Sequence, residues 1–176
     1  MPELRHPRSR KNAARNRIPG RRRTGHRQEE SLNNRKTLVI GIGNPGRRDD
    51  GAGAVLVERL QEHKIPGVVC DANYQLGIED ALDCSEHDTV VFVDAAVDLG
   101  APFTFTEIQP EYKAAVTTHH LLPEAVLALC GELYGRLPRA YVLAIGGSDW
   151  EIGEGLCEET ERNCRAALDH LLQFLK

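Results

Sequence analysis

The sequence predicts an α/β fold in which helices pack on both sides of a mostly parallel sheet. Short runs of apolar, β-branched residues alternate along the chain with longer segments whose apolar residues recur at helical spacing. Several of the runs contain almost no polar residues, which is typical of strands buried on both faces. Residues 37–176 have a suitable length for one domain with a single core. We therefore expect one three-layer α/β domain over this range.

Each element follows from its local pattern. The runs at 37–42, 89–94 and 139–145 are nearly continuous apolar stretches, and a shorter one covers 68–70. Residues 103–108 alternate Phe with Thr, which predicts a strand with one wetter face. Apolar residues recur every three or four positions in three further segments and predict helices, with one helical turn elsewhere. The helices are expected at 52–63, 123–134 and 158–175, and the turn at 78–82.

The charge is divided unevenly between an N-terminal segment and the body. Residues 1–36 contain 12 Lys and Arg, 3 acidic residues and almost no apolar residues. Such a segment cannot bury enough apolar surface to offset its ordering entropy, so we expect a basic disordered arm. Residues 37–176 contain 10 basic and 23 acidic residues. Nucleic acid is not expected as a partner, because phosphates attract basic surfaces.

Composition also indicates a compartment. No stretch approaches the roughly 20 apolar residues of a membrane-spanning helix, and no signal-peptide pattern opens the chain. The five cysteines include no C-x-x-C pair, so neither a disulfide framework nor a thiolate zinc site is indicated. We expect a cytoplasmic protein with reduced thiols and no membrane association. Cys157 and Cys164 are expected to be core residues on one face of the last helix.

A glycine-rich turn follows the first predicted strand. Residues 41–46 read G-I-G-N-P-G and match the dinucleotide-binding pattern G-x-G-x-x-G. In that site the turn leads directly into a helix whose N-terminus faces pyrophosphate. Here the loop continues through two arginines and then Asp49 and Asp50. Carboxylates stand where a phosphate would bind, so nucleotide binding is disfavoured.

Acidic and imidazole side chains are expected at one edge of the sheet. Asp94 ends a predicted strand, Asp49 and Asp50 end the loop after the first strand, and His119 opens a helix. Ligands of such sheets bind beyond the carboxyl ends of the strands. One of the two loop acids is expected to cap the following helix, and a histidine at a helix start is often only a capping or surface residue. Together, two carboxylates and an imidazole are a suitable set for a divalent ion with open coordination positions.

No motif for nucleophilic triad chemistry is present. The chain contains neither G-x-S-x-G nor H-E-x-x-H.

The ordered series of motifs resembles the hydrogenase maturation endopeptidases over residues 37–175. The segments that carry the resemblance are Val39-Ile-Gly-Ile-Gly-Asn44, Asp49-Asp50-Gly51-Ala52-Gly53, Phe92-Val93-Asp94-Ala95, Thr117-Thr118-His119, and Ile145-Gly146-Gly147 leading to Ile152-Gly153. The resemblance implies an α/β/α sandwich around a twisted sheet, of the phosphorylase/hydrolase-like type. It also implies an endopeptidase that removes a C-terminal peptide from a nickel-hydrogenase large-subunit precursor after nickel insertion.

The resemblance further implies the site residues. Asp50, Asp94 and His119 would be both the catalytic and the metal-contacting residues, and the metal would be nickel held by the precursor, which the resting enzyme need not retain. His119 is preferred over the adjacent His120 because it directly follows the Thr-Thr pair. Asn44 is expected to shape the backbone or to contact the substrate strand. The attacking group, a metal-activated water or a water activated by a carboxylate, stays open.

Two other functions compete with this one. Residues 43–46, Gly-Asn-Pro-Gly, resemble the opening of peptidyl-tRNA hydrolase, but the Asn and His that this family needs next are replaced by Arg47-Arg48-Asp49-Asp50-Gly51. A non-catalytic module could also dock a partner at the same sheet edge, although the presence of all three candidate ligands argues against it.

Overall fold

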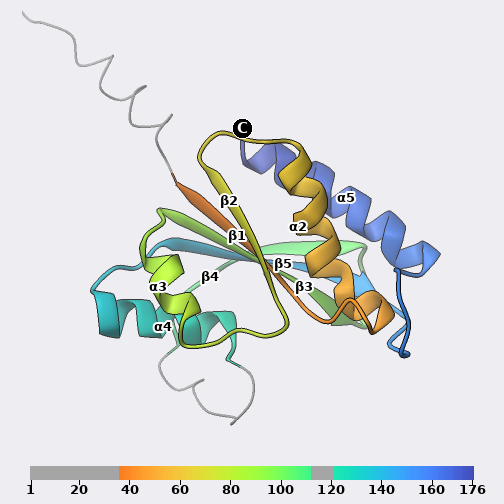
Figure 1. The fold of residues 1–176 in the computed structure, drawn as a ribbon, viewed down its shortest axis with the longest axis horizontal. Helices are drawn as coiled ribbons and strands as arrows, with labels where there is room; N and C mark the ends of the chain where they lie inside the picture. Colours follow the sequence, from red (N-terminus) through yellow and green to blue (C-terminus); the bar gives the residue numbers. More distant parts are fainter. Residues whose placement is uncertain (1–35, 112–120) are drawn as a thin grey trace, which may run out of the picture.

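A five-stranded sheet forms the centre of the protein (Figure 1), in a computed structural model that describes residues 36–111 and 121–176. The strands lie in the spatial order β2-β1-β3-β5-β4. Four of them run parallel, and β4 runs antiparallel to β5. The strands are β1 (Thr37–Ile42), β2 (Val68–Asn73), β3 (Thr89–Val97), β4 (Phe103–Ile108) and β5 (Arg139–Gly147). The prediction of a mostly parallel sheet is confirmed.

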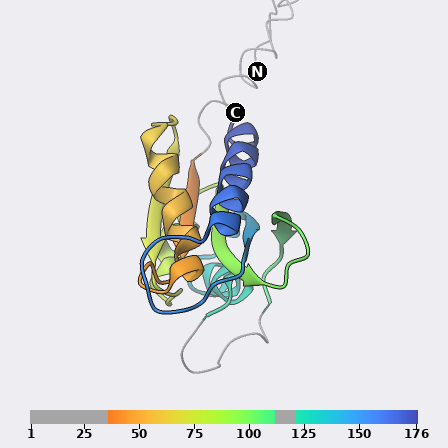
Figure 2. The ribbon, with the colours of Figure 1, turned by 90° about the vertical axis from the view of Figure 1, so that its right-hand side faces the viewer.

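Helices cover both faces of this sheet. The helices are α2 (Ala52–Glu62), α3 (Asp80–Ser85), α4 (Pro123–Tyr134) and α5 (Glu158–Phe174). Helices α2 and α5 lie side by side on one face (Figure 2), and α3 and α4 lie on the other. Successive side chains of a strand point to opposite faces, so Val39 packs toward α2 and α5 while Leu38 and Ile40 pack toward α3 and α4. The predicted three-layer α/β/α sandwich is therefore confirmed.

The strands extend further than the sequence pattern predicts. Asp94 does not end its strand, because β3 continues to Val97 and Asp94–Val97 pairs with Ala144–Gly147 of β5. Strand β2 likewise continues to Asn73, which pairs with Ile42. Backbone pairing with a neighbour extends these strands past the point where their apolar pattern ends.

Two sequence predictions fall partly or wholly outside the described residues. The basic arm expected at 1–36 is described only at Lys36, and His119 and His120 belong to the segment 112–120. Within the described parts of the chain, no helix is long and apolar enough to cross a membrane.

Close approach of α2 to the sheet depends on Gly53. A Cβ added to Gly53 would overlap the backbone carbonyl oxygens of Ile42 and Val93. Gly41 of β1 faces the same helix, and a Cβ there would overlap the carbonyl of Gly53. Both contacts are with backbone atoms, which cannot rotate away as a side chain can. The two glycines therefore determine how closely the start of α2 packs on the carboxyl end of β1.

We predict that Gly53→Ala destabilises the fold by at least about 2 kcal/mol. Alanine normally stabilises a helix relative to glycine by about 1 kcal/mol, so the expected effect has the opposite sign to helix propensity. Urea unfolding of both proteins measures the difference. Gly77→Ala is the matched control, because a Cβ there meets only the Glu79 side chain, which can rotate away. Equal stability of Gly53→Ala and the wild type would contradict the prediction.

Candidate functional site

Asp50 and Asp94 come together at the carboxyl edge of the sheet. Asp50 lies in a short 3-10 helix, η1 (Arg48–Gly51), which connects β1 to α2, and Asp94 lies in the neighbouring strand β3. Burial raises the pKa of Asp94 to about 6, and the Asp50 carboxylate adds to this rise, while a hydrogen bond from the Ala95 N–H acts against it. Asp50 and Asp94 thus follow from two adjacent strands, because β1, which leads to Asp50, pairs with β3.

Asp94 projects from the face of the sheet that α3 and α4 cover. It follows Val90 and Phe92 in the alternation of β3, and both of these pack in the core on that face. One carboxylate oxygen, Oδ1, accepts a hydrogen bond from the Ala95 N–H at 2.8 Å. Leu121, which directly follows the two histidines in sequence, packs against the same core. Asp94 and Leu121 therefore lie on the same face of the sheet.

The third predicted ligand, His119, and its alternative His120 lie outside the described residues. Among residues 36–111 and 121–176, no group of three or more His, Cys, Asp or Glu side chains is placed to hold a metal ion. The described part of the candidate site thus contains two carboxylates, Asp50 and Asp94.

Asp50 is held by the turn that precedes it. Its Oδ2 accepts a hydrogen bond at 3.0 Å from the backbone N–H of Asn44. The side-chain Oδ1 of Asn44 in turn accepts the N–H of Gly46 at 2.8 Å. Both amides therefore already have acceptors in the protein. This is a physical reason why the glycine-rich turn is not a phosphate site, since its N–H groups are not free to bind an anion.

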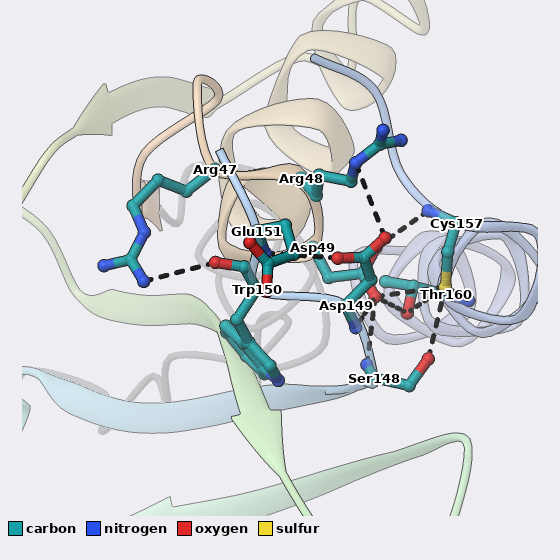
Figure 3. Close-up of polar contacts among 9 residues, drawn as sticks. All are labelled: Arg47, Arg48, Asp49, Ser148, Asp149, Trp150, Glu151, Cys157 and Thr160. Atoms are coloured by element: carbon teal, nitrogen blue, oxygen red, sulfur yellow. Dashed lines mark hydrogen bonds and ion pairs between the residues drawn. The ribbon is translucent and has the colours of Figure 1, made fainter. Parts of the chain in front are cut away.

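Asp49, the residue before Asp50, points into the protein toward Cys157 and Thr160 (Figure 3). The residue is fully buried, and its two carboxylate oxygens accept hydrogen bonds from five donors. The donors are the N–H groups of Ser148 (2.9 Å), Asp149 (2.8 Å) and Cys157 (2.8 Å), the Thr160 hydroxyl (2.8 Å) and the Cys157 thiol (3.1 Å). Burial alone would raise the pKa of Asp49, but the hydrogen bonds outweigh it and lower the pKa to about 2.

The expectation that one of the two loop acids caps the following helix is wrong. Helix α2 begins after Gly51 with no side-chain cap. Asp49 instead binds the start of α5, whose N-cap is Cys157 and whose first turn contains Thr160. The carboxylate sits where α5 leaves backbone N–H groups free, which is a favourable position for a negative charge.

Further contacts bind the acidic loop to the loop between β5 and α5. The two backbones exchange three hydrogen bonds, which are Arg48 N–H to Gly153 O (2.9 Å), Gly153 N–H to Gly46 O (2.9 Å) and Asp49 N–H to Asp149 O (3.0 Å). The Arg47 guanidinium donates to the carbonyl of Trp150 at 3.2 Å, and Arg48 pairs with Asp149 at 3.4 Å (Figure 3). Asp50 therefore belongs to a loop that backbone and side-chain contacts fix to the loop between β5 and α5.

Cys157 is another residue whose role the sequence analysis missed. It was expected to be a core residue like Cys164, which is fully buried. Its thiol instead contacts Asp49 and lies 3.3 Å from the Ser148 hydroxyl. The acidic run Glu158-Glu159 directly after it is a helix-start signal, and that signal could have placed Cys157 at the cap.

We predict that Asp49→Asn destabilises the fold by about 2 kcal/mol at pH 7. The size follows from a pKa of about 2 in the fold against 3.8 ordinarily. The pKa is lowered on folding, so this stabilisation is present above about pH 4 and is lost as the pH falls toward 2. Urea unfolding of the wild type and variant at pH 7 and pH 3 should show the difference shrinking in acid. A difference that does not depend on pH would contradict the assignment.

We predict that Asp94→Asn stabilises the fold by about 3 kcal/mol at pH 7. The pKa of Asp94 is raised on folding, from 3.8 to about 6, so its ionised form costs stability as the pH rises through this range. The asparagine Oδ1 can still accept the Ala95 N–H, and the charge is gone. Thermal unfolding should show a higher Tm than the wild type at pH 7 and a similar Tm below about pH 4. Asp169→Asn, an exposed residue of α5, is the matched control; a lower Tm for Asp94→Asn at pH 7 would contradict the prediction.

No protein-family model and no curated protein matches the sequence. Solved structures do match. The [NiFe] hydrogenase maturation protease HycI from Thermococcus kodakarensis KOD1 superposes with a TM-score of 0.64 at 24% identity, over 84% of this chain and 97% of that protein. The hydrogenase maturating endopeptidase HybD from E. coli gives a TM-score of 0.62 at 24% identity, over 80% and 91% of the two chains.

A third match is the hydrogenase 2 maturation peptidase from Thaumarchaeota archaeon SCGC_AB-539-E09. It superposes with a TM-score of 0.61 at 25% identity and covers 80% of this chain and 97% of that one. Likeness at these identities concerns the fold. The chain therefore has the fold of the hydrogenase maturation endopeptidases, the family whose motifs its sequence resembles.

Proposed function

We propose that this protein is an endopeptidase that removes a C-terminal peptide from a nickel-hydrogenase large-subunit precursor after nickel insertion. The observation that carries the proposal is the pairing of Asp50 and Asp94 at the carboxyl edge of the sheet. The three solved structures with this fold described above are all named as maturation proteases or peptidases. Its place of action would be the cytoplasm.

The nickel belongs to the precursor in this proposal. Asp50 and Asp94 would offer carboxylate oxygens to it, and His119 would offer an imidazole nitrogen. Two carboxylates supplied by a rigid edge leave coordination positions for the ligands that the precursor itself provides. Contact with the metal and placement of the scissile peptide would then be one event. The protease would act only on a precursor that carries its metal.

The carboxylates also suit the hydrolysis itself. Asp94 has a pKa of about 6, so it is ionised at pH 7 and still basic enough to accept a proton from an attacking water. Its Oδ1 is engaged by the Ala95 N–H, which leaves Oδ2 for a proton or a metal.

Exposed apolar residues on the loops around this edge fit a protein substrate. Ile78 lies beyond the end of β2, Val97 ends β3, Leu122 precedes α4, and Ile152 lies between β5 and α5. All four are more than half exposed, and Ile152 reaches 89%. Scattered exposed apolar residues are ordinary, but four of them on segments that lead away from the carboxyl edge offer contacts to an extended polypeptide. A peptidyl-tRNA substrate is not favoured, because residues 37–176 are acidic overall.

The decisive test compares a nickel-loaded precursor with its nickel-free form. We expect the purified protein to release a C-terminal peptide from the loaded form alone, as read by intact mass. Asp50→Asn and Asp94→Asn should lower the rate by at least about 100-fold, because each removes a charged group that contacts the reacting centre. His119→Ala should lose activity and His120→Ala should keep it.

Asp169→Asn serves as the control, because this exposed residue of α5 lies away from the carboxyl edge. Full processing by folded Asp50→Asn and Asp94→Asn variants would refute the metal-contact role. Equal cleavage of loaded and nickel-free precursor would refute metal recognition.

A further inference from the structure

Asn44 is a hydrogen-bonding centre next to the acidic pair. Its backbone N–H donates to Asp50 Oδ2 at 3.0 Å, and its backbone carbonyl accepts the N–H of Arg47 at 3.0 Å. Its side-chain Oδ1 accepts two hydrogen bonds, from the Gly46 N–H at 2.8 Å and from the Tyr74 hydroxyl at 2.8 Å. Four contacts thus hold one half-buried residue in the first turn after β1.

These contacts determine which way the side-chain amide faces. A backbone N–H can only donate, so the atom it meets at 2.8 Å must be the amide oxygen and not the nitrogen. Tyr74 adds a second donor to the same oxygen. The Nδ2 group therefore lies on the opposite side, and among the described residues it donates to no protein atom. Two N–H donors of Asn44 thus have no acceptor among residues 36–111 and 121–176.

The order of the strands determines which residues surround the Asn44 amide. Strand β1 lies between β2 and β3, so the turn after β1 lies between Tyr74, which directly follows β2, and Asp94 in β3. Tyr74 is 69% exposed although its hydroxyl is bonded, so its position is not explained by core packing. A chain that approached Asp94 along this edge from the side of β2 would pass the turn that carries Asn44.

We infer that the Asn44 amide binds a backbone carbonyl of the substrate polypeptide, and that Tyr74 is the positioning residue that orients this amide. The inference rests on the proposed endopeptidase function and adds a group that recognises the peptide chain itself. An amide donor suits this task because every residue of a substrate carries a carbonyl acceptor. The contact is made equally in the bound state and during cleavage, so it contributes to KM and not to kcat.

The test is steady-state cleavage of the nickel-loaded precursor by Asn44→Ser, Tyr74→Phe and the double variant. Serine keeps an oxygen that can accept the Gly46 N–H and adds no charge beside Asp50. We expect Asn44→Ser to raise KM about three- to tenfold and Tyr74→Phe about threefold, with kcat unchanged, as for loss of a hydrogen bond between neutral groups. In the Asn44→Ser background, Tyr74→Phe should have no further effect, because Tyr74 acts through Asn44. Tyr134→Phe, on α4, is the matched control and should leave KM unchanged.

The outcomes separate the inference from the function on which it rests. Cleavage by the wild type with an unchanged KM in both single variants overturns the inference and leaves the function standing. Additive effects of the two substitutions overturn the positioning role of Tyr74. If Asn44→Ser does not fold, the KM of Tyr74→Phe decides alone, with its Tm as the check on folding. Failure of the wild type to cleave the loaded precursor overturns the proposed function, and the inference falls with it.

Discussion

The buried carboxylate of Asp49 is the constraint on which the geometry of this site depends. A negative charge away from water is unfavourable unless it is fully hydrogen-bonded. Five donors from the loop after β5 and the start of α5 supply those bonds. The loop that carries Asp49 can then take only one position relative to α5. The position of Asp50, the next residue, is fixed as a result. Of the two adjacent acids, Asp49 holds the loop inside the protein and Asp50 lies at the edge of the sheet.

The carboxylate of Asp94 lowers the stability of the fold when it is ionised. Asp94 is placed on a buried strand beside Asp50, where both burial and a neighbouring negative charge oppose its ionisation. A protein selected for stability alone would not keep two carboxylates in this arrangement. Raised pKa values of this kind gather where a protein binds cations or moves protons. Asp49 is stabilised by its hydrogen bonds, whereas the ionisation of Asp94 is unfavourable. This contrast is expected where one residue maintains the fold and another belongs to a functional site.

The sequence predicted the layers of this fold and the place of the acidic pair, because buried strands and amphipathic helices have a visible period. The sequence-based predictions were wrong where contacts between distant parts of the chain determine the end of a strand or the direction of a side chain. The apolar run of β3 stops at Asp94, but pairing with β5 carries the strand to Val97. The direction of Asp49 could not be read from its neighbours, since all five donors lie about a hundred residues away in the chain. Tyr74 carries no local signal of its contact with Asn44, which lies 30 residues earlier in the chain.

The separation between Asp49 and its donors also bears on when the site forms. Its hydrogen bonds span 99 to 111 residues of sequence, so they close one of the longest loops in the described chain. Contacts of such long range form only after most of the chain entropy has been lost. The acidic edge is thus a product of complete folding and not of the β1–α2 unit that bears it. A partly folded molecule would carry both aspartates without fixing their positions, and so would not yet contain the proposed site.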